Sequence, residues 1–359
     1  MSEDQAHDAA AAGRRVPAEA LEAFAIAALL ACGVRKDVAE PVARGLTQAS
    51  LRGVDSHGLR LLPHYLRATR AGRLNGDPEL RFERRSAAAG LLDADHTFGH
   101  AAGRAAMRHA LALAAEAGLG AVAVRHSSHF GAAAFYALEA AEAGCIGLCT
   151  THADALLLTP GGTRPFFGTN PIAFCAPVEG EGPLCLDMAS SRVTWNRLLE
   201  RREGGLPLEP DWAVDAEGRS TRDAELAAAL LPIGDYKGFG IALMVEVLCS
   251  LLTGMPWGRD LTRMYADPLE RRRHLGHFFL AIDVARFEDP ARFRRRMRAL
   301  LDELRAEPAR AGGPAPRAPG DPEKACERER RARGIPVPAR LWTELLAIAA
   351  DCALAPPEL

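Results

Sequence analysis

The segment GVDSHG, at positions 53–58, places a histidine directly after a hydroxyl-bearing side chain. We expect His57 just inside the start of a helix capped by Asp55 or Ser56, where the helix dipole disfavours the imidazolium ion. Its pKa is then expected near or below neutrality, which suits a group that passes a proton to and from a substrate. Ser56, whose hydroxyl neighbours the imidazole, is a second catalytic candidate. The alternative interpretation is a capped helix start with a surface histidine.

Two arginines near this histidine could orient an anionic ligand. Arg60 follows His57 by about one helical turn, and Arg52 precedes it. A guanidinium group forks onto a carboxylate through two parallel hydrogen bonds. We therefore expect Arg60 or Arg52 to bind a substrate carboxylate.

A second histidine-rich segment, RHSSHFG at positions 125–131, lies between an expected strand and an expected helix. Loops at the carboxyl ends of strands are where α/β proteins bind ligands, so His129 is a candidate site residue. A competing interpretation joins His126, His129 and His152 around a metal ion, because zinc accepts such ligands. No Cys-x-x-Cys pair or His-x-x-x-His spacing supports that site, so we expect no metal. A His-liganded, metal-dependent hydrolase remains the alternative from another functional class.

Two further segments could bring the backbone close to a ligand. GTN at 168–170 is followed by LDMASS at 186–191, in which Asp187 ends an apolar strand and needs a partner there. It could orient a histidine or bind a ribose hydroxyl; the alternative is a turn and a capped helix start. DYKGFG at 235–240 opens a helix, where free N–H groups and Lys237 suit a phosphate, or else a solvated lysine.

Composition restricts the functional classes. The 359 residues carry a formal net charge of −2, so the chain has no overall field that attracts nucleic acid or anionic lipid. Apolar runs such as 241–245 are short, so we expect no membrane span. The acidic N-terminus lacks the apolar region of a secretory signal. Eight cysteines without a Cys-x-x-Cys pair indicate free thiols in a cytoplasmic protein.

The elements that must position these groups alternate between helices and strands. Apolar periodicity predicts helices over 17–32, 36–51, 102–117, 130–143, 237–253, 290–307 and 339–353, and strands over 121–124, 145–151, 171–177, 184–188 and 278–283. The helix over 237–253 is apolar almost all round and is expected to be buried. The pattern indicates an α/β core flanked by helical segments from both termini. We expect a disordered tail (1–16), a helical domain (17–75 with 290–359) and a cofactor-binding, catalytic α/β domain (76–289).

Familiar motifs are missing. The sequence contains no G-x-G-x-x-G, no Walker lysine, no His-Glu-x-x-His and no G-x-S-x-G. An ordered set of other motifs, over about 16–345, resembles the malate/L-lactate dehydrogenase family that is unrelated to the Rossmann-type lactate dehydrogenases. The motifs are GVDSHG (53–58), HFG (129–131), AGCIG (143–147), PGG (160–162), GTNPIAF (168–174), LDMASS (186–191), LLPIGDYKGFG (230–240), LGHFFLAID (275–283), PGDPE (319–323) and RGIPVP (333–338).

The resemblance implies an oxidoreductase that uses NAD or NADP, bound by a family-specific, non-Rossmann domain with a mixed sheet, and it implies a homodimer. His57 matches the family's proton donor and acceptor, and His129 matches a second active-site histidine. Thr169 and Asn170 lie in the substrate cleft by analogy. The positions that match cofactor contacts are Asp187, Met188, Ala189, Tyr236, Lys237, Gly238, Gly320, Asp321 and Pro322.

The chain departs from the family pattern near both ligands. Many members have an arginine four residues after the first histidine, where this chain has Leu61, and Arg60 is one position early. The segment TWNR at 194–197 is bulkier than usual and is expected to reshape the cofactor pocket. The expected reaction is hydride transfer between nicotinamide and C2 of a small 2-hydroxy or 2-oxo acid, such as malate, lactate or ureidoglycolate. Reduction of a cyclic imine-2-carboxylate with the same cofactor is the alternative.

Overall fold

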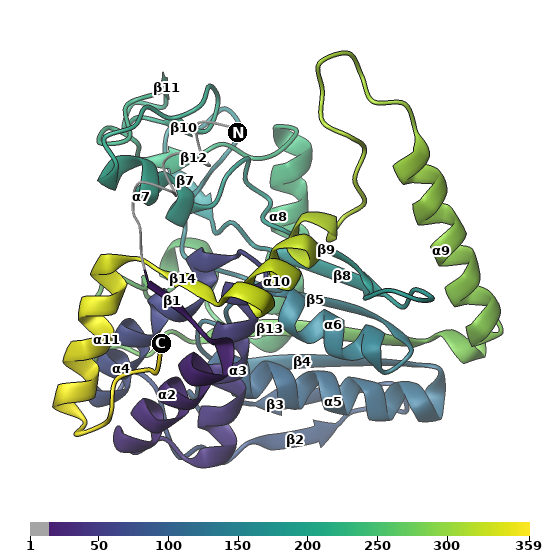
Figure 1. The fold of residues 1–359 in the computed structure, drawn as a ribbon, viewed down its shortest axis with the longest axis horizontal. Helices are drawn as coiled ribbons and strands as arrows, with labels where there is room; N and C mark the ends of the chain where they lie inside the picture. Colours follow the sequence, from purple (N-terminus) through teal and green to yellow (C-terminus); the bar gives the residue numbers. More distant parts are fainter. Residues whose placement is uncertain (1–13) are drawn as a thin grey trace.

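The computed structural model describes residues 14–359, and its centre is a seven-stranded mixed sheet (Figure 1). The strands run in the order β2-β3-β4-β13-β5-β8-β9, and their bounds are Arg81–Arg84, Ala89–Asp93, Leu119–Ser127, Leu275–Asp283, Cys145–Thr151, Ile172–Ala176 and Leu184–Met188. Only β3 and β4 pair in parallel; the other neighbours are antiparallel. The expected α/β fold with a mixed sheet is confirmed.

Helices cover both faces of this sheet. On β5, Cys149 donates to the Ala133 carbonyl beside α6 (Ala134–Glu142), and the next residue, Thr150, contacts Cys249 of α8 (Tyr236–Cys249). Successive strand residues point to opposite faces, so α6 and α8 lie on opposite sides. Helix α5 (Gly99–Ala117) packs on β4 beside α6, as Figure 1 shows. Its alanine-rich face allows this close approach.

The N-terminal helices form a separate apolar core with the C-terminal end of the chain. This core joins α2 (Ala18–Ala31), α3 (Lys36–Leu51), α4 (Leu62–Arg70) and α11 (Ala339–Asp351). Strand β1 (Arg14–Val16) pairs with β14 (Ile335–Val337), so residues 14–16 are not the disordered tail expected for 1–16. Positions 1–13 of that prediction lie outside the described residues.

The expected grouping of 17–75 with all of 290–359 is wrong for one helix. α10 (Asp321–Arg333) and α11 return to the N-terminal helices, but α9 (Pro290–Ala306) lies apart from them in Figure 1. Leu301 of α9 packs instead against Val178, which follows β8. Its arginine-rich sequence gave no sign of which apolar surface it joins.

A second, small sheet lies within the region expected to be one α/β domain. Its order is β11-β10-β12-β6-β7, with bounds Ser220–Thr221, Ala213–Val214, Ala229–Leu230, Leu157–Leu158 and Pro165–Phe167. Helix α7 (Trp195–Glu203) packs on it through the buried Leu198. These two- and three-residue strands are too short to show a period-two pattern in the sequence.

The expectation that the helix over 237–253 is buried is wrong for one of its faces. Ile241, Met244, Val247 and Leu251 are 37–54% exposed. Within the described chain, Tyr236–Thr253 is also the one helical stretch long and apolar enough to cross a membrane by length and composition. A single stretch of this kind is weak evidence, because core helices of soluble proteins pass the same test, and the buried Glu246 at its centre is hydrogen-bonded within the protein.

Candidate active site

A cavity of about 880 Å³ lies between the N-terminal helices, the end of β9 and the small sheet. His57, His129, Asp187 and Gly320 are among the residues that line it. We call the lining around His57 and His129 the histidine end and the lining around Asp187 and Gly320 the carboxylate end. The volume is in the range of cavities that bind cofactors and small substrates.

The histidine end begins at a sharp turn after α3. Residues Asp55–His57 and Leu59–Leu61 form two single helical turns, and the Ser50 hydroxyl accepts the Leu59 N–H at 3.0 Å. A Cβ atom on Gly58 would collide with that hydroxyl, which explains the glycine after the histidine. The turn places the Ser56 hydroxyl 2.9 Å from Nδ1 of His57.

The two histidines predicted from separate segments meet in space. The His57 and His129 rings stack with centroids 5.6 Å apart and planes 20° apart. The Tyr65 hydroxyl lies 2.7 Å from Nδ1 of His129 and fixes that ring from behind. Sequence reasoning missed Tyr65, which lies eight positions after His57 on α4, the helix that follows the two turns.

Burial keeps both imidazoles neutral. It lowers the pKa of His57 to about 4, and the nearby Arg60 charge adds to the effect. Burial also lowers the pKa of His129 well below its usual value, with further contributions from His57 and Arg273. The expected direction for His57 was therefore right, but desolvation is the main cause, since a three-residue helical turn carries little dipole.

The arginines expected to bind a carboxylate lie in different places. Arg60 does not line the cavity, because its guanidinium pairs with Glu200 at 3.0 Å. Arg52 does line it, pairs with Glu327 at 3.3 Å, and leaves its buried Nη2 without a partner. The cation that sequence reasoning missed is Arg273, which lines the cavity and is 3% exposed. The run of three arginines at 271–273 gives no sign of which one is buried.

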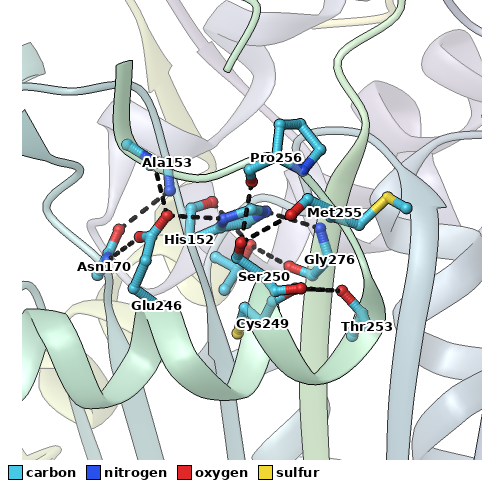
Figure 2. A network of polar contacts seen from close by, with 12 residues as sticks. His152, Ala153, Asn170, Glu246, Cys249, Ser250, Thr253, Met255, Pro256 and Gly276 are labelled. Atoms are coloured by element: carbon cyan, nitrogen blue, oxygen red, sulfur yellow. Dashed lines mark hydrogen bonds and ion pairs between the residues drawn. The ribbon is translucent and has the colours of Figure 1, made fainter. Parts of the chain in front are cut away.

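Thr169 lines the cavity, but Asn170 supports the wall behind it. The Asn170 amide donates to the Ala242 carbonyl at 2.9 Å and to Glu246 at 2.7 Å, and its oxygen accepts the Ala153 N–H. Figure 2 shows this network, in which Glu246 also contacts His152. Asn170 therefore ties the cavity wall to α8 and does not face the cavity as the substrate-cleft prediction required.

The carboxylate end gathers residues from two distant segments. Met188 and Ala189 line the cavity beside Asp187, and Gly320 and Pro322 line it at the start of α10. The Ala134 N–H, at the start of α6, donates to the Asp187 carboxylate at 2.8 Å. The Asp187 side chain is exposed at the cavity lining, but the surrounding protein atoms desolvate its carboxyl group and raise its pKa to about 6 despite that hydrogen bond.

Some predicted cofactor contacts lie outside the cavity. Tyr236 and Lys237 are exposed at the start of α8, and Gly238 packs so closely on the Ile233 carbonyl that a Cβ atom would collide. Asp321 pairs with Arg305 at 2.6 Å and accepts the Ala318 N–H, so its carboxylate supports the loop before α10. None of these four residues lines the cavity.

The residues at the carboxylate end suit a dinucleotide. Gly320 has φ +92°, and a Cβ atom on it would lie 3.0 Å from the Cys185 carbonyl, so α10 starts close to β9 only with glycine there. Arg317 and the N-terminus of α10, where the helix dipole is positive, line the cavity together with the acidic Glu323, and Asp187 offers an acceptor for hydroxyl groups.

The histidines of the metal alternative are engaged separately. His126 contacts Asp93 at 3.0 Å, His129 contacts Tyr65, and His152 accepts the Gly276 N–H at 2.8 Å. Over residues 14–359, no group of three or more His, Cys, Asp or Glu side chains is arranged to hold a metal ion.

Comparisons with known proteins point to one enzyme family. Residues 16–346 match the family described as malate/L-lactate dehydrogenase. A malate dehydrogenase of Pyrococcus abyssi is 36% identical over 301 residues, covering 81% of this chain and 82% of its own. A (2R)-3-sulfolactate dehydrogenase (NADP(+)) of Chromohalobacter salexigens is 35% identical over 338 residues, covering 94% and 98%. The crystal structure of malate dehydrogenase from Entamoeba histolytica superposes with a TM-score of 0.92 at 28% identity, covering 96% of this chain and all of that one.

Other similar proteins widen the range of substrates. They include a ureidoglycolate dehydrogenase (NAD(+)) of Escherichia coli strain K12, 32% identical over 319 residues, which cover 89% of this chain and 91% of its own. A Delta(1)-pyrroline-2-carboxylate reductase of Ancylobacter novellus is 33% identical over 326 residues, which cover 89% and 93%. The chain belongs to the malate/L-lactate dehydrogenase family of NAD(P)-dependent oxidoreductases.

Proposed function

We propose that the protein transfers hydride between a nicotinamide cofactor and C2 of a small 2-hydroxy or 2-oxo acid, with the chemistry at the histidine end of the cavity. The observation that carries this proposal is the stacked pair His57 and His129, neutral and facing one cavity with a buried cation beside them. A neutral imidazole accepts the proton of a substrate hydroxyl, as oxidation at C2 requires.

The cofactor supplies the hydride acceptor or donor when it is bound. Asp187 would accept hydrogen bonds from ribose hydroxyls, and the start of α10 with Arg317 would attract phosphate. His57 would take the proton from the substrate hydroxyl through Nε2, because Ser56 occupies Nδ1. Tyr65 holds His129 against His57, so the ring next to the base keeps its position as the proton moves.

A second candidate reaction is reduction of a cyclic imine-2-carboxylate. The similarity to the pyrroline-2-carboxylate reductase favours it. In this direction His57 would give a proton to the imine nitrogen. The test is oxidation of NADH and NADPH, followed by absorbance, with a panel of 2-oxo acids and cyclic imines. Turnover of either class supports a nicotinamide-dependent reductase, and its absence with both cofactors contradicts the proposal.

The proposal includes a cytoplasmic homodimer. The eight cysteines are all free thiols, as expected in a reducing compartment. The exposed apolar face of α8, which carries Met244 and Val247, is a surface that a second copy would cover. Val247→Glu should therefore convert a dimer into a monomer in size-exclusion chromatography with light scattering. The control is Glu329→Gln on α10, away from that face. A wild-type monomer would contradict the dimer.

A further inference from the structure

One buried cation faces the histidine end of the cavity. Among the arginines that line the cavity, Arg263 is 61% exposed and bound by Asp267, whereas Arg273 is 3% exposed. Arg273 is close enough to His129 for its charge to help lower the pKa of that ring, after burial and His57. Arg52 acts at the other end, where its charge opposes the effect of burial on Asp187.

Arg273 has hydrogen-bonding capacity that the protein does not use. In the described chain its guanidinium makes one hydrogen bond, from Nη2 to Asp154, and its buried Nε has no partner. Asp154 is itself held by the Met264 N–H at 2.7 Å, so the pair is fixed. A guanidinium has five N–H donors and matches a carboxylate with two of them. An unpartnered buried donor is costly unless a ligand accepts from it.

Four apolar side chains line the cavity near this cation, beside polar groups that include His129 and Tyr265. The apolar side chains of Leu61, Leu156, Met264 and Leu275 line the cavity. Leu61 lies four positions after His57, Leu156 and Leu275 lie two positions after Asp154 and Arg273, and the Met264 N–H binds Asp154. Leu61, Met264 and Leu275 are at most 7% exposed. Asp154 already offsets part of the Arg273 charge, so this end can neutralise one carboxylate. A second anionic group placed against these apolar side chains would lie in hydrocarbon without a partner.

We propose that the preferred substrates carry a single carboxylate and an apolar substituent at C2, with Arg273 binding the carboxylate and Leu61 bounding the substituent. The inference rests on the proposed function and adds the substrate class to it. It applies equally to 2-oxo acids with one carboxylate and to cyclic imine-2-carboxylates. Dianionic acids such as malate and 3-sulfolactate would be disfavoured.

The decisive experiment compares 2-oxobutyrate with oxaloacetate, which have the same carbon skeleton and differ by a methyl group in place of a carboxylate. We expect kcat/KM to favour 2-oxobutyrate by at least about tenfold, because the second charge finds no partner. Δ1-Pyrroline-2-carboxylate belongs in the same panel as a monoanion. Equal or better turnover of oxaloacetate would overturn this inference alone. No turnover of any substrate with NADH or NADPH would overturn the proposed function and this inference with it.

Variants of two residues sharpen the test. Leu61→Arg should raise kcat/KM for oxaloacetate relative to 2-oxobutyrate by about tenfold or more, and the uncharged Leu61→Met should not. Arg273→Lys should raise KM for every carboxylate by about tenfold, since lysine lacks the fork, while the dissociation constant of NADH stays unchanged. Unchanged cofactor binding also shows that the variant is folded. An Arg273→Lys enzyme with wild-type KM would contradict the assigned role.

Discussion

The two ends of the cavity use burial to opposite effect. At the histidine end, burial lowers the pKa of His57 to about 4, so the base is free of its proton near neutrality. At the carboxylate end, desolvation raises the pKa of Asp187 to about 6, so this carboxyl group is only partly ionised in weakly acidic solution. In both cases desolvation disfavours the charged form, and only the type of group decides whether a proton is lost or kept.

The difference teaches how one cavity separates two tasks. A neutral imidazole is ready to accept a proton from a substrate, and a carboxyl group with a backbone N–H partner is ready to hold hydroxyl groups. Each task needs a group whose charge is set locally. The ends can therefore be perturbed one at a time.

The largest expected effect comes from removing the base at the histidine end. We expect His57→Asn to lower turnover by about 10²- to 10⁴-fold while cofactor binding is unchanged, because the amide cannot take up the proton. Steady-state kinetics and fluorescence titration with NADH measure the two quantities. The control His109→Asn lies outside the cavity, stacked on Phe82, and should retain activity. Wild-type turnover in His57→Asn would remove this residue from the mechanism.

The next effect is at the other end. Gly320→Val should weaken cofactor binding by roughly tenfold or more, because a Cβ atom meets the Cys185 backbone and φ +92° strains a branched side chain. The matched control is Gly312→Val, which has φ +69° but open space around its Cβ position. Isothermal titration with NADH and NADPH compares them. Equal losses in both variants would mean that backbone strain, and not the close approach to β9, explains the result.

A smaller effect should separate the ends by pH. As the pH falls through about 6, Asp187 gains a proton and becomes a poorer acceptor, so cofactor affinity should fall a few-fold between pH 7.5 and 5. Substrate KM should change little in this range, because the pKa of His57 is about 4. Asp187→Asn should flatten the cofactor profile. A wild-type profile that is flat, or a variant profile that keeps its slope, would contradict this assignment.

The sequence predicted the parts of the site that local motifs define. His57, His129 and Asp187 were each identified within a short segment, and the structure brings all three to one cavity. Each of these side chains lies in a turn or near the end of a strand, so its position depends mainly on residues close to it in the sequence. The fold class and most helices were likewise local, because apolar periodicity reports them directly.

Properties that depend on distant partners could not be predicted. Arg60 and Arg273 look alike as residues, but only the tertiary fold places Glu200 beside one and the cavity beside the other. Helix α8 reads as buried because apolar residues surround it, whereas its exposed face reflects what the single chain leaves uncovered. The position of α9 depends on a few apolar contacts, such as Leu301 with Val178, hidden in an arginine-rich sequence.

The smallest expected effect is on the stability of the cofactor-free protein. The pKa of Asp187 is about 6 in the folded chain, above its usual 3.8, so between these values the folded state binds more protons than the unfolded state. The Asp187 contribution to stability therefore falls as the pH rises through this window and stays unfavourable above it. Asp187→Asn should raise the Tm relative to wild type at pH 7.5, and less so at pH 5.

The control for this comparison has the opposite sign. Arg305 lowers the pKa of Asp321, so that carboxylate stabilises the fold above its usual pKa. Asp321→Asn should therefore lower the Tm at pH 7.5. As the pH falls below 6.5, the buried histidines lower the stability of all three proteins by the same amount. Differences in Tm from wild type at each pH therefore isolate the effect of the carboxyl groups. Differential scanning fluorimetry at the two pH values measures them, and a lower Tm for Asp187→Asn at pH 7.5 would show that its hydrogen bond to Ala134 outweighs the cost of desolvating its charge.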